Sequence, residues 1–279
     1  MDNQNYENYS EDLLIDLELT GIKEMLSKEL EGGYQYSNTY VPRVSELIRT
    51  TIFDDDKFRF ALSNLKSKYE EITERALQTG IVAHTMIEDY LIEGSRKDTI
   101  NYMGKYPQAE IPKVLNCFNN FLGWLKYLED IKLQFEVIKI EEKITCPWYG
   151  GTCDMIASII YPNGIKKTYV FDFKSSRKLS FEYYLQTMLY LKALNYNKAY
   201  IGSDLPFIDG IAVLRLDKTN PIFEYIVLDK DINIDFLNHL DQACNSIVDW
   251  YYYLKSTQYY FKQFTKSNKV RGDNYGLLY

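Results

Sequence analysis

The feature that most constrains the fold is a pair of strand-like segments separated by a short turn in the middle of the chain. Residues 152–160 are largely apolar, residues 169–173 are β-prone, and Pro162-Asn163-Gly164 lies between them. Proline favours the first turn position and glycine accepts the left-handed conformation, so the sequence predicts a hairpin with a three-residue loop and a G1 bulge. A two-residue Asn163-Gly164 loop is the alternative, and it shifts the strand pairing by one residue.

The three-residue loop determines which residues face each other across the hairpin. Tyr161 then faces Ile165, and the same register places Asp154 directly opposite Asp172 on one face of the sheet, with Cβ atoms about 4.5–5.5 Å apart. Lys174 follows Asp172 by two residues, so its side chain shares that face. The shorter loop would separate the two aspartates.

Two carboxylates this close repel each other unless a cation lies between them. Carboxylate oxygens are preferred ligands of Mg²⁺ and Mn²⁺, so the pair indicates a divalent metal site. Such a metal ion activates water and neutralises phosphoryl charge, and an adjacent ammonium group stabilises the transition state of phosphodiester hydrolysis. A surface aspartate pair beside a solvated lysine is the alternative, and the pattern alone favours it.

Periodicity along the rest of the chain predicts a mixed β-sheet with helices against its faces. An extended segment at residues 41–44 leads into a helix near Ser45, and Gly80 is expected to separate two later helices. Further helices are expected at residues 57–78, 81–93, 110–130, 181–194 and 232–255, and strands at residues 132–140, 152–160, 169–173, 210–216 and 223–228. This order is typical of an α/β (α+β) fold with a mixed central sheet.

The acidic charge of the chain is concentrated at its N-terminus. The formal net charge is −7, and residues 1–19 contain six acidic side chains and no Lys or Arg, so the remaining body is nearly neutral. No linker-like stretch divides that body. We therefore expect an acidic arm at residues 1–20 and a single domain at 21–279, with a helical part at about 40–130, a core at about 131–230 and a C-terminal helix at about 231–265.

Two basic clusters lie within this body. One includes Arg177 and Lys178 directly after the hairpin, which makes them candidate substrate-binding residues. The other spans residues 255–271 and alternates with aromatic side chains. Basic and aromatic residues together suit single-stranded nucleic acid, although a solvated amphipathic helix explains the second cluster equally well.

The four cysteines are scattered and form no C-x-x-C pair. They are expected to be buried free thiols in a reducing compartment. The start of the chain lacks the features of a signal peptide, and no apolar run approaches the roughly 20 residues of a membrane span. These features predict an intracellular protein that does not associate with a membrane.

Several motifs, in a consistent order over roughly residues 40–215, resemble the RecB-like branch of the PD-(D/E)xK nuclease superfamily, which includes phage exonucleases and the mitochondrial genome maintenance exonuclease. Cys153 replaces the proline of the "PD" element, whose role is backbone shape and not chemistry. The matching segments are residues 41–44 (P-S-V-T), 80–88 (G-x-x-x-H-x-x-x-E), 135–137 (the strand glutamate), 151–154 (G-x-x-D), 172–176 (D-F-K-T/S) and 186–190 (Q-x-x-x-Y).

The resemblance implies a restriction-endonuclease-like core preceded by a helical region, and a metal site within it. His84, Asp154 and Asp172 would hold Mg²⁺ or Mn²⁺, with the backbone carbonyl of Phe173 as a further ligand. Some relatives carry an iron–sulfur cluster, but only Cys244 lies beyond the core. We therefore expect no such cluster here.

The resemblance also implies roles around the metal. Lys174 would be the catalytic lysine, acting with the two aspartates, and Glu136 would be an outer ligand or water contact. Gln186 and Tyr190 share one helix face and would order the site or contact the nucleic acid.

The function implied is that of a metal-dependent deoxyribonuclease. We expect an exonuclease on single-stranded or end-containing DNA in phage-type recombination, replication or genome processing. Recombination or replication proteins are its candidate partners, and its expected location is the cytoplasm (that of a bacterial host for a phage protein). The alternative is a catalytically weak nucleic-acid-binding or structural protein on the same fold. A site-specific endonuclease is a weaker alternative, because no recognition insertion is evident.

Overall fold

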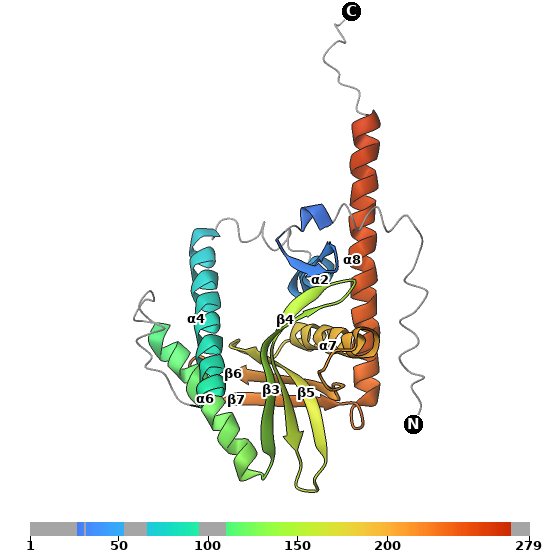
Figure 1. The fold of residues 1–279 in the computed structure, drawn as a ribbon. Coiled ribbons are helices and arrows are strands. Elements are labelled where there is room, and N and C mark those ends of the chain that lie inside the picture. Colours follow the sequence, from blue (N-terminus) through green and yellow to red (C-terminus); the bar gives the residue numbers. More distant parts are fainter. Residues whose placement is uncertain (1–26, 31, 53–65, 95–109, 269–279) are drawn as a thin grey trace, which may run out of the picture.

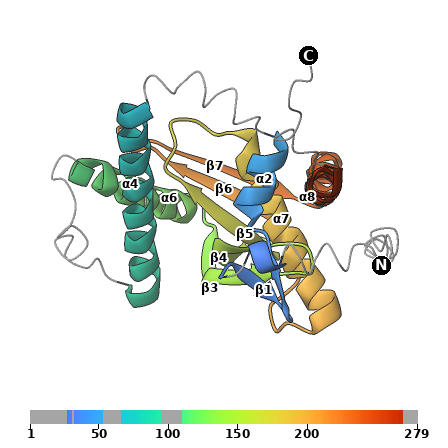
Figure 2. The ribbon, with the colours of Figure 1, turned by 90° about the horizontal axis from the view of Figure 1, so that it is seen from above.

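The computed structural model describes residues 27–30, 32–52, 66–94 and 110–268, so the expected acidic arm lies outside the described residues. A five-stranded sheet lies between helices on both faces (Figures 1 and 2), which confirms the predicted mixed sheet flanked by helices. The elements are β1 (Tyr34–Tyr36), β2 (Thr39–Val41), α2 (Val44–Ile52), α4 (Lys66–Glu93), α6 (Ile111–Asp130), β3 (Gln134–Thr145), β4 (Gly150–Ile160), β5 (Lys166–Lys174), α7 (Phe181–Tyr196), the π-helical turn η5 (Asn197–Ile201), β6 (Gly210–Leu216), β7 (Phe223–Asp229) and α8 (Ile234–Asn268).

The sheet has the order β3-β4-β5-β6-β7. Strands β3, β4 and β5 form an antiparallel meander, β6 runs parallel to β5, and β7 is antiparallel to β6. A parallel pair needs a crossover connection, and α7 supplies it between β5 and β6. Helices α4 and α6 cover one face, and α7, α8 and α2 cover the other (Figure 2).

The central hairpin has the register that the three-residue loop predicts. The N–H of Tyr161 donates to the carbonyl of Ile165 at 2.9 Å, and Gly164 has a φ of 82°. The strand pairing runs to Met155 opposite Phe171, one residue before the two aspartates. The prediction of the loop and register is therefore confirmed.

Helix α4 differs from the prediction, because it continues through Gly80 without a break. A glycine inside a helix costs about 1 kcal/mol relative to alanine, and tertiary packing overrides that preference here. A Cβ atom at Gly80 would lie 3.0 Å from the Oγ of Ser175, so the glycine lets α4 approach the segment that follows β5. Residues 57–65 of the first expected helix lie outside the described residues.

Trp124 of α6 is the centre of the core on the α4–α6 side of the sheet, and it is fully buried. Its ring contacts Phe121, Phe135, Phe171 and Tyr225 at centroid distances of 5.7, 5.2, 5.8 and 5.4 Å. Because Phe171 lies on β5, this core fixes the strand that carries the candidate site.

Other elements have the bounds predicted from the sequence, extend beyond them, or were not predicted. Helix α2 starts within one residue of the predicted position, and β6 has the predicted bounds. The β1–β2 hairpin and η5 were not predicted, and β3 and α8 run further than expected. The four cysteines are buried free thiols, as expected. Among the described residues, no helix is both long and apolar enough to cross a membrane.

Candidate active site

The two hairpin aspartates lie where β4 and β5 stop pairing. The last paired residues of these strands are Met155 and Phe171. Beyond this pair, the backbone N–H of Phe173 donates to the Oδ2 of Asp154 at 2.5 Å. Burial opposes ionisation of Asp154, but His84, Lys174 and this N–H stabilise the carboxylate and lower its pKa. Asp154 is therefore held as an anion in one orientation.

Helix α4 brings His84 to the same point. Its Nδ1 lies 3.3 Å from the Oδ1 of Asp154, and its ring packs edge-on against Phe173 with centroids 5.9 Å apart. Burial lowers the pKa of His84, but the charge of Asp154 and its hydrogen bond outweigh burial and raise it. A metal ion requires the neutral imidazole, so metal binding at this position would displace a proton.

Glu141 completes a group of three metal-ligating side chains that the sequence did not predict. One ligand atom from each of His84, Glu141 and Asp154 lies within 4.8 Å of the others. Glu141 lies on β3 between residues paired with Met155 and Cys153, and its φ is 49°. Loss of hydration, followed by the charges of Asp154 and Glu88, raises the pKa of Glu141 to about 7.

Glu136, the strand glutamate expected at the site, lies elsewhere. It pairs with Ser158, four residues along β4 from Asp154, and that separation is about 13 Å along a strand. Its carboxylate contacts the Nζ of Lys166 at 2.7 Å and is half exposed. The motif matched the right strand but the wrong position, because the position depends on how far β3 runs beside β4. Glu141 occupies the place that Glu136 was expected to take.

Asp172, which is buried, and Lys174, which is partly buried, form an ion pair next to this group. The Nζ of Lys174 lies 2.8 and 2.6 Å from the two carboxylate oxygens of Asp172. Burial is the largest influence on Asp172. Burial and the charge of Asp154 raise the pKa of Asp172, whereas the charge of Lys174 lowers it. The net result is a pKa of about 6. Burial lowers the pKa of Lys174, but Asp172 and Asp154 outweigh it, so the ammonium stays charged.

A hydrogen-bonded chain from α7 orients this lysine. The Nζ of Lys174 donates to the Oε1 of Gln186 at 3.1 Å, and the Nε2 of Gln186 donates to the hydroxyl of Tyr190 at 2.9 Å. Tyr190 is buried, and a Cβ atom at Gly151 would lie 2.5 Å from its ring. Only glycine at position 151 therefore leaves room for the ring of Tyr190. Of the two roles expected for Gln186 and Tyr190, the contacts support ordering of the site. The buried Tyr190 does not offer a surface to nucleic acid.

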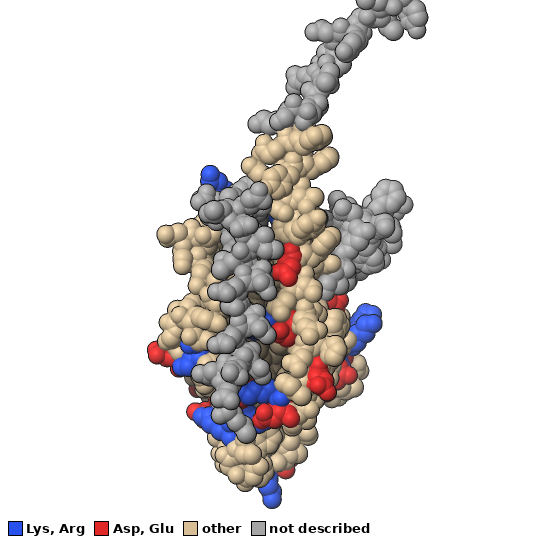
Figure 3. All heavy atoms as spheres, turned by 90° about the vertical axis from the view of Figure 1, so that its right-hand side faces the viewer, with Lys and Arg blue, Asp and Glu red and all other residues tan. Residues whose placement is uncertain are grey.

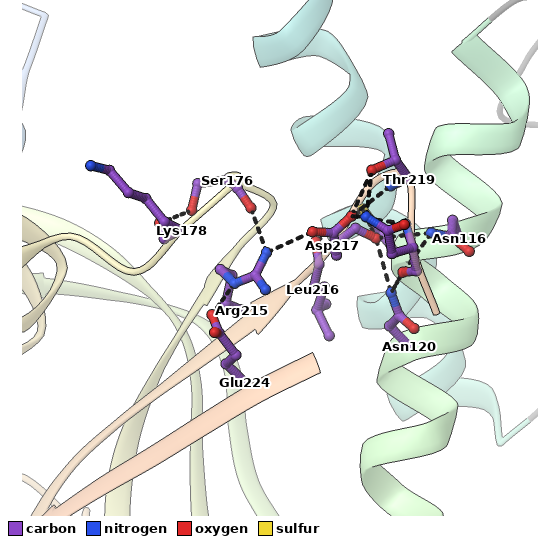
Figure 4. Close-up of polar contacts among 11 residues, drawn as sticks. Asn116, Asn120, Ser176, Lys178, Arg215, Leu216, Asp217, Thr219 and Glu224 are labelled. Carbon is purple, nitrogen blue, oxygen red and sulfur yellow. Dashed lines mark hydrogen bonds and ion pairs between the residues drawn. The ribbon is translucent and has the colours of Figure 1, made fainter. Parts of the chain in front are cut away.

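The two expected substrate-binding residues follow the site directly. Arg177 and Lys178 are exposed on the segment after β5. Arg177 lines a cavity beside the site, and the side chain of Lys178 extends away from Arg215 and Asp217 (Figure 4). The Oγ of Ser176 donates to the carbonyl of Lys178 at 2.8 Å and holds this segment in a turn.

The C-terminal basic and aromatic cluster lies on α8, which projects beyond the body of the protein (Figure 1). Tyr260, Phe261 and Phe264 are exposed there, and Lys255 lies 5.5 Å from the ring centre of Tyr251. In Figure 3, acidic and basic side chains are interspersed mainly over the lower part of the molecule and not on the projecting end of α8. The described residues give no connection between this cluster and the candidate site.

The donors of the site suit a divalent cation. Two carboxylates and one imidazole converge, with Asp172 close enough to interact electrostatically with His84 and Asp154. Carboxylates are the preferred ligands of Mg²⁺ and Mn²⁺, and an imidazole favours Mn²⁺ of the two. Of the expected ligands, the structure therefore groups His84 and Asp154, and it places Asp172 against Lys174.

Comparisons with known proteins identify no family for this chain, so its function is inferred from the geometry of the site. A scan against protein-family models finds no match, and a search of curated proteins finds no close one. Among solved structures, the chain matches one titled "Crystal structure of SSO0001", with a TM-score of 0.25 and 12% identity over 61% of this chain and 74% of that chain. So low a score carries no argument about fold or function.

Replacing Glu141 by glutamine is expected to weaken Mn²⁺ binding by at least about 10–100-fold, the range found for groups that support a metal site. A proton competes with the metal at a carboxylate whose pKa is about 7. Wild-type affinity should therefore fall by about tenfold per pH unit as the pH drops below that pKa, and this dependence should be shallower in the variant.

Calorimetric titration of Mn²⁺ at several pH values would measure both effects. Glu136→Gln is the matched control, because Glu136 lies on the same strand and contacts Lys166. Equal losses in the two variants would contradict the placement of Glu141 at the metal.

Proposed function

We propose that this protein is a metal-dependent nuclease that hydrolyses phosphodiester bonds of DNA. The observation that carries the proposal is the proximity of two groups of side chains. The Asp172–Lys174 ion pair adjoins the cluster of His84, Glu141 and Asp154. Structural ion pairs do not require a set of metal donors beside them, whereas phosphodiester hydrolysis uses both.

Each residue of the site has a separate role in this proposal. His84, Asp154 and Glu141 would hold the divalent cation, which supplies an activated water and neutralises phosphoryl charge when bound. Lys174 carries a fixed positive charge that can stabilise the charge developing on the phosphoryl group. Gln186 restrains the ammonium, so little reorganisation is needed during the reaction.

The finer parts of the proposal depend on the order of the sequence motifs. That order supports membership of the RecB-like branch of the PD-(D/E)xK superfamily and exonuclease action on single-stranded or end-containing DNA. We propose that the protein acts in the cytoplasm during recombination, replication or genome processing. Partner proteins from those processes are part of the same proposal.

A gel time course with DNA labelled at either end tests the proposal. Purified protein is incubated with single- and double-stranded DNA in Mg²⁺, Mn²⁺ or EDTA, beside Asp172→Asn. Metal-dependent degradation that the variant lacks is the expected result, and the order of label release gives the polarity. Well-folded wild-type protein that binds DNA without cutting it would instead support a nucleic-acid-binding function on this fold.

A further inference from the structure

A cavity of about 490 Å³ lies next to the candidate active site, between α4, α6, the segment after β5 and the β6–β7 turn. We call it the basic pocket. Its lining includes four basic side chains and several hydroxyl groups, and the residues that matter here are Arg75, Thr79, Lys113, Ser175, Arg177 and Lys218. Its volume is within the range of about 300–1,000 Å³ that is typical of small-molecule sites.

The basic pocket and the active site share two segments of the chain. Ser175 directly follows Lys174, so one strand end serves both. On α4, Thr79 lines the pocket and lies five residues before His84, a rise of about 7.5 Å along the helix. An extended strand of nucleic acid bound at the metal donors would therefore pass the pocket.

The lining of the pocket has an excess of positive charge, although the chain as a whole is acidic. Its two carboxylates are both engaged. Glu110 lies 2.8 Å from the Nζ of Lys113, and Asp217 accepts a hydrogen bond from Arg215. Burial, with a contribution from Lys113, lowers the pKa of Lys218. An anion in the pocket would relieve the repulsion between these ammonium groups.

Hydrogen bonds fix the wall of the pocket, as Figure 4 shows. The Nη1 of the buried Arg215 donates to the carbonyl of Ser176 at 3.0 Å and to the Oδ2 of Asp217 at 2.9 Å. The side chain of Asn120 donates to the carbonyls of Asp217 and Asn220, each at 2.9 Å. The segment after β5 and the β6–β7 turn are thereby tied to α6 before any ligand arrives.

We propose that the basic pocket binds a phosphate group of the DNA strand next to the phosphate that is cleaved. This inference rests on the proposed function and assigns a substrate subsite that uses no metal. Ammonium and guanidinium groups with adjacent hydroxyls are suitable partners for phosphate oxygens. A contact of this kind holds the strand in register without reading its bases.

The test is the salt dependence of binding to a labelled single-stranded oligothymidine in EDTA, measured by fluorescence anisotropy. Arg177→Gln/Lys218→Gln removes two charges from the pocket and keeps a side-chain N–H donor at both positions, one of which (Lys218) donates to the carbonyl of Ala76 in the wild type. The double variant should bind at least about tenfold more weakly, and its slope of log K against log salt should be shallower by about 0.7, the value for one phosphate contact.

Two further variants separate the possible outcomes. Lys126→Gln, on the surface of α6 and paired with Asp130, should bind like the wild type. Asp172→Asn should keep the wild-type slope while it loses cleavage. An unchanged slope in the double variant, an equal loss in Lys126→Gln, or no wild-type binding in EDTA would overturn the subsite. Normal binding through the pocket without any metal-dependent cleavage by the wild type would overturn the nuclease proposal alone.

Discussion

Replacing Lys174 by methionine is expected to lower the rate of DNA cleavage by about 10²–10⁴-fold, the range for the loss of one catalytic proton donor or charge-stabilising group. The reason is geometric. The ammonium contacts both oxygens of Asp172 and the amide oxygen of Gln186, so its charge is fixed at the edge of the metal donors. Single-turnover rates measured with saturating DNA would isolate the effect on the chemical step.

A second effect of this substitution concerns stability. Without the ammonium, the buried carboxyl of Asp172 loses its closest counter-charge and still has Asp154 nearby, so the pKa of Asp172 should rise above its present value of about 6. An acid whose folded-state pKa exceeds its unfolded value makes the folded state less stable as the pH increases between those values. Thermal unfolding of Lys174→Met at several pH values should therefore show a larger loss of stability towards neutral pH than the wild type shows, since the wild-type Asp172 already has a raised pKa.

Lys166→Met is the matched control for both effects. Lys166 lies on the same strand, is half exposed, and pairs with Glu136 away from the metal donors. It should cleave DNA at the wild-type rate and unfold with the wild-type pH dependence. Cleavage by Lys174→Met at the wild-type rate would remove the lysine from the reaction and leave Asp172–Lys174 as a structural ion pair.

The parts of the site that could be predicted from sequence are those set by local chemistry. The Pro162-Asn163-Gly164 turn fixes its own loop length, and through the two-residue period of a strand it fixes the faces of Asp172 and Lys174. The contact of Lys174 with Gln186 of α7 likewise joins two residues that are close in the sequence. These features required no knowledge of distant strands.

The parts that could not be predicted depend on long-range pairing. Glu141 reaches Asp154 only because β3 continues beside β4 and changes register between Val137 and Lys139. Nothing in the sequence around Glu141 specifies that irregularity, so the motif pointed to Glu136 instead. The place of Gly80 inside α4 also involves a distant residue, because a Cβ atom there would lie 3.0 Å from the Oγ of Ser175, nearly a hundred residues later.

Truncating Trp124 to alanine is expected to destabilise the protein by about 3–5 kcal/mol, which is typical of removing a large buried aromatic side chain. The indole ring contacts four aromatic rings from α6, β3, β5 and β7, and the cavity left behind cannot close without moving the sheet. Trp124→Phe retains most of the volume and should lose less. Denaturant unfolding followed by circular dichroism would measure the free energies of unfolding.

This substitution also tests whether the aromatic core supports the active site or only the fold. Trp124 touches Phe171, the neighbour of Asp172 on β5, so a shift of that strand would displace the aspartate from the metal donors. We expect Trp124→Ala to weaken Mn²⁺ binding even at temperatures where the variant is folded, because Phe173, whose N–H holds the metal donor Asp154, lies on the same strand. Tyr127→Ala, an exposed position on the same helix, should leave both quantities near wild type. Wild-type metal affinity in folded Trp124→Ala would show that the site is held by its own hydrogen bonds and not by the packing beneath it.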